Sequence, residues 1–186
     1  DAHDYIGLCR KGDRGRRQAV AKYPLIGKAE ELQKNEARAA QLQIAVLGEL
    51  DQFEIVRRFG IERPVLEAWV DIGDLEDSPS NTIPGLYERL TGWLPGLIEH
   101  RCGVGERGGF LLRLREGTWP AHILEHVTIE LQNLAGMKVG FGKARETGER
   151  GIYKVAVRTR NEEVGRACLQ AGRDLLMAAI EDRPFD

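Results

Sequence analysis

The pattern of hydrophobic and polar positions divides the chain into a short amino-terminal segment and a longer domain. Residues 29–47 are rich in Ala, Glu, Gln and Leu, a composition that favours a helix. A basic run with interspersed glycines, residues 10–17, precedes them and is typical of a solvated loop. We therefore expect a helical and loop segment over residues 1–51, whose role and origin stay open, and a separate domain over residues 52–186.

β-branched and aromatic residues predict the strands of that domain. Residues 53–61 and 65–72 read as two strands, and Arg63-Pro64 between them predicts the turn. The alternating residues 152–159 predict a later strand, whereas the glycine-rich and polar residues 140–151 before it predict a loop.

Helical signals fill most of the remaining chain. Thr82 is a candidate N-cap for a helix toward Ile98 that is kinked or split at Pro95-Gly96. Thr118 and Pro120 open the strongest helix, which ends near Ala135-Gly136, and Asn161 caps a last helix through Ile180. Residues 110–115 fit either a strand or a helical turn. Because strands and helices lack a regular βαβ order, the expected fold is α+β, a mostly antiparallel sheet with helices on one face, plus the helical amino-terminal segment.

Charge and cysteine content narrow the range of partners. The chain of 186 residues has 27 basic and 29 acidic side chains, so no net field attracts nucleic acid or an anionic membrane. No apolar stretch approaches the roughly 20 residues of a membrane helix. Cys9, Cys102 and Cys168 are too irregularly spaced for a disulfide framework, which favours a reducing, cytoplasmic location.

The strongest predicted helix carries a possible metal site. His122 and His126 lie four residues apart, so both imidazoles project from one helix face and can share a zinc ion. With Glu125 they spell H-x-x-E-H, the inverted zinc-peptidase order in which the glutamate is the general base. Glu130 extends the same stripe as a further candidate ligand.

The third ligand and the accessibility of this face are less determined by the sequence. Glu130 lies two helical turns from His122, so convergence of both on one ion needs long rotamers or helix distortion. Glu67, Glu146 or Glu149 could serve instead. We expect Leu124, Val127, Leu131 and Leu134 to form a separate core face, which would leave the histidines accessible. The alternative is that the two histidines are ordinary surface residues.

Basic residues flank the histidine helix along the sequence, mixed with acidic ones. Such a mixture suits a ligand that carries both carboxylates and guanidiniums, although an ordinary surface has the same composition. The glycine-rich segments 103–109 and 140–143 lack P-loop spacing, so ATP binding in this chain is not expected. The candidate ligand-binding residues are Arg107, Arg113, Arg115, Lys143, Arg145 and Arg150.

Several short motifs together make the chain from about Phe53 resemble the amino-terminal domain of the cyanophycin synthetase family. The motifs are SNTIPGLYE at 80–88, EHRC at 99–102, GGF at 108–110, LREGTW at 114–119, the stretch from His122 to Glu130, and GFGKARET at 140–147.

This resemblance implies a parent enzyme that makes cyanophycin, a poly-aspartate backbone with arginine on each side chain. The parent enzyme uses ATP and Mg²⁺ in an ATP-grasp domain and a Mur-ligase-like domain, and works as a homo-oligomer. For the present domain it implies binding of the growing polymer. Two alternatives are a zinc-dependent peptidase-like site that cuts polymer into primers, with His122 and His126 as ligands, Glu125 as base and Glu130 as ligand or supporting group, and a purely structural scaffold.

Overall fold

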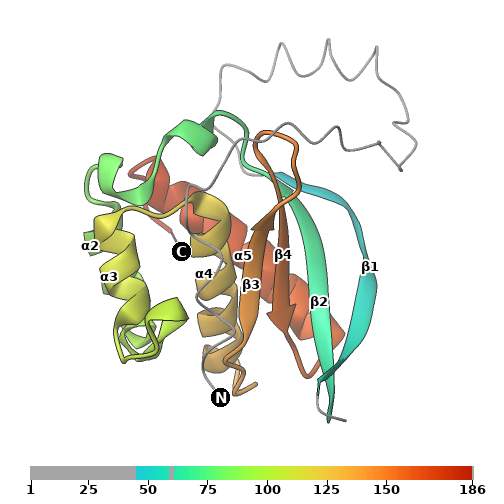
Figure 1. Cartoon of the computed structure of the whole chain (residues 1–186). Coiled ribbons are helices and arrows are strands. Elements are labelled where there is room, and N and C mark those ends of the chain that lie inside the picture. Colours follow the sequence, from blue (N-terminus) through green and yellow to red (C-terminus); the bar gives the residue numbers. More distant parts are fainter. Residues whose placement is uncertain (1–44, 59–60, 186) are drawn as a thin grey trace, which may run out of the picture.

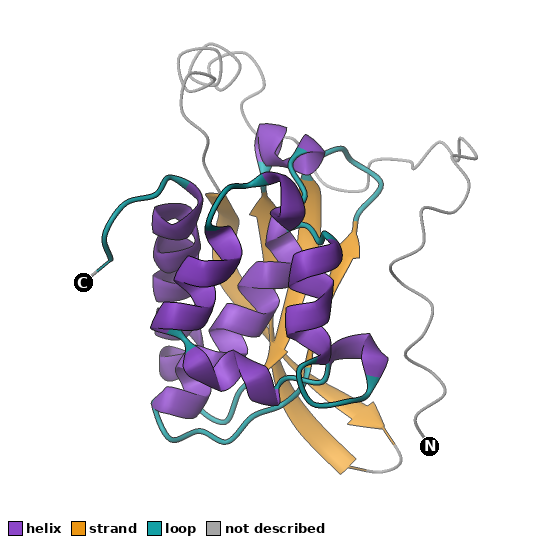
Figure 2. Ribbon diagram, turned by 90° about the vertical axis from the view of Figure 1, so that its left-hand side faces the viewer, coloured by secondary structure: helices purple, strands orange, loops and turns teal. Residues whose placement is uncertain are grey.

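The protein is an α+β sandwich in which helices cover one face of an antiparallel sheet (Figures 1 and 2). The computed structural model describes residues 45–58 and 61–185. This architecture confirms the fold class predicted for the domain. Residues 29–44 of the predicted helix over residues 29–47 lie outside the described residues. The prediction is wrong for residues 45–47, which belong to a strand.

The described part of the sheet has four strands in the order β1-β2-β4-β3. They are β1 (Ala45–Arg58), β2 (Ile61–Asp71), β3 (Gly142–Glu146) and β4 (Ile152–Arg158). The predicted turn at Arg63-Pro64 is wrong, because both residues pair with β1, opposite Val56 and Ile55. Pro64 is tolerated within β2 because the β2–β4 ladder begins only at Val65, so a missing N–H there breaks no pair on that side.

Strand β3 takes residues 142–146 of the predicted loop over residues 140–151, and the rest of that segment is loop and turn as predicted. The strand pairs antiparallel with β4, with Gly142 opposite Val157 and Glu146 opposite Tyr153. As a short edge strand with charged residues, it lacks the apolar alternation by which the sequence would have revealed it.

The helices are α2 (Leu86–Trp93), α3 (Gly109–Glu116), α4 (Pro120–Leu134) and α5 (Glu162–Ile180). Helix α3 resolves the choice between strand and helical turn at residues 110–115. The predicted split before Ile98 is confirmed, because α2 ends at Trp93 and a 3-10 turn, Pro95–Glu99, follows.

The cap predictions had mixed outcomes. Asn161 caps α5 as predicted, since its side-chain oxygen accepts a hydrogen bond from the Val164 N–H. Thr82 does not cap α2, whose N-cap is Gly85, because its hydroxyl donates to the Pro79 carbonyl instead. Helix α4 begins at Pro120 after Trp119, and the Thr118 side chain is engaged with His122.

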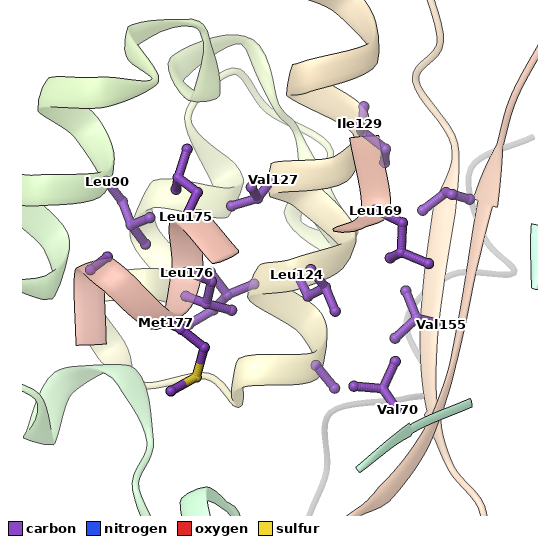
Figure 3. Close-up of a cluster of buried hydrophobic side chains, with 14 of the residues drawn as sticks. Val70, Leu90, Leu124, Val127, Ile129, Val155, Leu169, Leu175, Leu176 and Met177 are labelled. Atoms are coloured by element: carbon purple, nitrogen blue, oxygen red, sulfur yellow. The ribbon is translucent and has the colours of Figure 1, made fainter. Parts of the chain in front are cut away.

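Helix α4 lies between the sheet on one side and α3 on the other, with α5 packed alongside (Figure 1). Its Leu124 and Val127 face the core that Val155 of β4 and Leu176 of α5 complete (Figure 3). Leu134, predicted in this core face, is instead 67% exposed at the end of the helix. Because α4 is enclosed on several sides, most of its polar side chains are buried. No helix among the described residues is long and apolar enough to span a bilayer.

Candidate functional site

The polar stripe of α4 is buried, contrary to the expectation that its histidines are accessible. His126, Glu125 and Glu130 are only 5–6% exposed. Three elements bury them: Phe110 of α3 stacks on the His126 ring with centroids 4.0 Å apart, β3 lies against Glu125, and the turn with Gly96 lies against Glu130. Burying two carboxyl groups and an imidazole costs free energy unless they are partnered, so their surroundings are informative.

His122, one turn before His126, is partly exposed, and each of its ring nitrogens contacts a neighbouring side chain. Its Nδ1 lies 2.7 Å from the Thr118 hydroxyl, and its Nε2 lies 3.3 Å from Sγ of Cys102. Burial lowers the pKa of His122 to about 4, assisted by the positive charge of Arg113. The imidazole is therefore neutral near pH 7, the form that a metal ion requires.

His126 is contacted by a second histidine that lies outside α4. Its Nδ1 lies 2.9 Å from Nδ1 of His100, which follows the 3-10 turn Pro95–Glu99. The Nε2 of His100 lies 3.0 Å from Oε2 of Glu130. Burial, and then the nearby His122 and His100, hold the pKa of His126 well below its usual range. This side chain is thus also neutral near pH 7.

Glu125 points toward the edge strand β3. Burial raises its pKa to about 8, although the Ala144 backbone N–H and the charge of Lys143 act in the opposite direction. Gly142 makes room for it, since a Cβ at that position would lie 2.6 Å from Cγ of Glu125. Its Oε1 is 4.0 Å from Nε2 of His126, so the carboxyl group adjoins the ring nitrogen that His100 does not contact.

Cys102, His122 and His126 form a group of metal-binding type. One potential ligand atom from each lies within 4.8 Å of the others. The donor set fits zinc, because two ligand atoms of one tetrahedral zinc ion lie roughly 3.5 Å apart and the Sγ–Nε2 distance here is 3.3 Å. Cys102 also adopts a left-handed backbone conformation, with φ of 51°, a strain that proteins concentrate at functional sites.

The structure separates the predicted ligands. His122 and His126 meet as predicted, but Glu130 bonds to His100 and is not in the group of three. Glu67 on β2 forms an ion pair with Lys154 at 2.6 Å. Glu146 and Glu149, the other glutamates weighed as a third ligand, are exposed on β3 and on the turn after it.

Sequence reasoning missed Cys102 and His100 as members of this cluster. They are separated by one residue in the EHRC motif at 99–102, a spacing that could have marked them as a pair of potential ligands. Their proximity to α4 was not foreseeable, because it depends on how the 3-10 turns pack over Phe110.

The predicted ligand-binding basic residues do not form one patch. Arg107 pairs with Glu99 at 2.5 Å and Arg150 with Asp77, both at the exposed surface. The Arg115 guanidinium lies 4.2 Å from the centre of the Tyr87 ring. Lys143 and Arg145 are on β3, opposite Ala156 and Lys154. Arg113 and Lys143 are the two that act electrostatically on the α4 cluster.

Comparison with known proteins identifies close relatives of this domain. The family model of the cyanophycin synthase-like N-terminal domain matches residues 67–181. The cyanophycin synthetase of Synechocystis sp. (strain ATCC 27184 / PCC 6803 / Kazusa) is 49% identical over 112 residues, 60% of this chain and 13% of the relative. The cyanophycin synthetase of Trichormus variabilis is 50% identical over 112 residues, which are 60% of this chain and 12% of the relative. The cyanophycin synthetase of Geminocystis herdmanii is 51% identical over 102 residues, which are 55% of this chain and 12% of the relative. The chain thus spans only 12–13% of the length of these relatives.

Proposed function

Because the chain belongs to the cyanophycin synthase-like N-terminal domain family, we propose that it handles the polymer of a cyanophycin synthetase and carries a metal-dependent site that hydrolyses cyanophycin. The observation that supports hydrolysis is the group of Cys102, His122 and His126, two members partly exposed and His126 buried, with the Glu125 carboxyl group beside it. A scaffold domain has no need to bring this set of side chains together.

Zinc suits the proposed centre better than a hard cation does. Two neutral imidazoles and a thiolate are ligands that zinc prefers, whereas magnesium and calcium prefer oxygen. When bound, zinc would supply Lewis acidity toward an amide carbonyl and toward water. Cys102 and His122 are both partly exposed, so polymer would approach the site from their side.

Glu125 is the proposed general base and acid. Its carboxylate takes a proton from the attacking water as the water oxygen bonds to the amide carbonyl carbon, and it returns that proton to the nitrogen as the C–N bond breaks. The products are a carboxylate end and an amine end, so a long polymer yields two shorter chains. A carboxyl group with a raised pKa is suited to this exchange near neutral pH.

We assign polymer binding to cationic side chains of α3 and β3, of which Arg113 and Lys143 act on the site itself. Arg113 and Lys143 act on His122 and Glu125, and Arg115 lies over the Tyr87 ring on the outer side of α3. These groups would attract the carboxylates of the arginine units and of the chain end of cyanophycin. In the parent enzyme, the ATP-grasp and Mur-ligase-like domains, with ATP and Mg²⁺, would extend the chains that this domain holds or cuts.

The test is metal content and polymer cleavage in one preparation of the 186-residue chain. We expect about one zinc ion per chain, lost in the His122→Ala/His126→Ala variant, and cyanophycin fragments detected by mass spectrometry that disappear with a chelator.

Glu125→Gln should abolish cleavage while zinc remains bound. Glu163→Gln, at an exposed position in the first turn of α5, is the matched control and should cleave like the wild type. Zinc-free protein with intact polymer would instead favour a binding domain or a scaffold.

A further inference from the structure

Glu130, His100 and His126 form a continuous hydrogen-bonded line inside the domain. Oε2 of Glu130 lies 3.0 Å from Nε2 of His100, and Nδ1 of His100 lies 2.9 Å from Nδ1 of His126. The H-x-x-E-H pattern assigns no role to His100, and Glu130, a candidate ligand by sequence, is not in the group of three potential ligands. Their side chains are nevertheless 8% exposed, so this polar line is retained in the core at a cost.

The position of Glu130 is built into the fold. The carboxyl group lies against Gly96 in the 3-10 turn that leads to His100, where a Cβ would be 1.8 Å from Oε1 of Glu130. Any larger residue at position 96 would displace the carboxyl group. The same turn therefore makes room for Glu130 and presents His100 to it.

The donors and acceptors along this line are linked, because a ring nitrogen can donate a hydrogen bond only if it carries a proton. The Glu130 carboxylate accepts, so Nε2 of His100 must carry the proton between them. When its single ring proton is on Nε2, His100 offers only a lone pair at Nδ1, and this lone pair is matched by a proton on Nδ1 of His126. Nε2 of a neutral His126 is left with a free lone pair on the side of Glu125.

We propose that Glu130 and His100 are positioning residues that hold His126 in the tautomer with its proton on Nδ1, so that the Nε2 lone pair is available to the ion shared with His122 and Cys102. The stacked Phe110 ring keeps the plane of the imidazole fixed. The inference rests on the proposed metal site, and hydrogen-bonding partners of this kind orient metal-binding histidines in other proteins.

His122 offers an internal parallel. Its Nδ1 is occupied by the Thr118 hydroxyl, and its Nε2 faces Sγ of Cys102. Both histidines of α4 therefore have Nδ1 engaged by a neighbouring group, and the same nitrogen, Nε2, remains in each. The two ring planes differ by 74°, but each imidazole keeps Nε2 for the ion because a different partner engages its Nδ1.

The direct test is the tautomer of His126 in the metal-free 186-residue chain. Long-range ¹H–¹⁵N NMR of protein labelled with ¹⁵N-histidine distinguishes the two ring nitrogens, and comparison with His126→Gln assigns the signals. We expect a protonated Nδ1 and an unprotonated Nε2 for His126. A proton on Nε2 would overturn the proposal, since the hydrogen-bonded line would then run in the opposite direction.

A pair of substitutions at position 100 tests the consequence for metal binding. His100→Leu keeps the volume and removes the acceptor, so we expect Co²⁺ affinity, followed by its visible absorption, to fall about 10- to 100-fold. His100→Asn places an amide oxygen where Nδ1 lay and should restore most of that affinity. Thermal unfolding of both variants checks that the domain is folded.

Equal Co²⁺ affinities of the Leu variant and the wild type would overturn the positioning role. Equal losses of Co²⁺ affinity in the Leu and Asn variants would overturn it too. A loss that the amide oxygen of Asn does not restore would come from altered packing and not from the missing acceptor. Neither readout uses hydrolysis. Suppose that cyanophycin stays intact, that Nδ1 of His126 is protonated, and that the Leu and Asn variants differ in Co²⁺ affinity. This combination would reject the proposed hydrolysis and support the positioning role.

Discussion

Gly142 of β3 lies so close to Glu125 of α4 that a Cβ on the glycine would be 2.6 Å from the glutamate Cγ and 2.7 Å from its Oε1. This close approach brings the edge strand against the helix and buries the carboxyl group between them. It also lets the Ala144 N–H of the same strand bond to the carboxyl group. The position of Glu125 thus depends on the absence of a side chain at residue 142.

Gly142→Ala should therefore destabilise the domain, because either β3 or Glu125 must move. Overpacking of this kind costs on the order of 1–3 kcal/mol of unfolding free energy. Gly140→Ala is the matched control, since a Cβ there meets nothing within 4 Å, and it should be nearly neutral. Chemical denaturation followed by circular dichroism measures both. Equal stabilities of the two variants would show that β3 does not confine Glu125.

The stability of the metal-free domain should fall from pH 6 to pH 8 because of Glu125. Its pKa is raised from 4.5 to about 8, so the folded state favours the protonated form and stability is lost as the pH rises through this interval. Glu125→Gln cannot ionise and should escape about 2 kcal/mol of that loss. Denaturation after chelator treatment, with Glu163→Gln as control, measures the difference. Parallel pH profiles of wild type and Glu125→Gln would contradict the raised pKa.

Cys102→Ser should weaken metal binding more strongly than a substitution of a group that only orients a ligand, such as His100. Changes to groups that merely orient ligands cost about 10- to 100-fold in affinity, so loss of a thiolate ligand should cost more than about 100-fold. It should also remove the sulfur-to-cobalt absorption band of the Co²⁺ protein. Cys168→Ala, on α5 and outside the group of three, is expected to keep both the affinity and the band. A Co²⁺ spectrum that Cys102→Ser leaves unchanged would exclude this ligand.

Arg113→Ala and Arg115→Ala should each weaken binding of cyanophycin several-fold, and more so at low salt, because the contacts are electrostatic. Arg173→Ala removes a half-buried arginine of α5 that is paired with its neighbour Asp174, and it should leave affinity unchanged. Binding of fluorescent polymer at two salt concentrations measures all three. If the Arg113 and Arg115 variants bind like Arg173→Ala, polymer binding must be assigned to another surface.

The sequence predicted local features well where the signal is periodic or stereochemical. The four-residue spacing of His122 and His126 and the Asn161 cap both follow from helix geometry within a few residues. Strand β3 was missed and the β1–β2 turn was misplaced, because edge pairing and a proline at the end of a ladder are decided by neighbouring strands.

By itself, the sequence determined the family resemblance, the α+β class and the presence of two histidines and a glutamate on one helix. Tertiary structure alone decided that this helix face is buried, that Glu125 meets β3, and that Cys102 and His100 join the cluster. The physical reason is range: helix periodicity is fixed by bonds between residues four apart, whereas the cluster forms where the 3-10 turns after α2 pack across α3 onto α4.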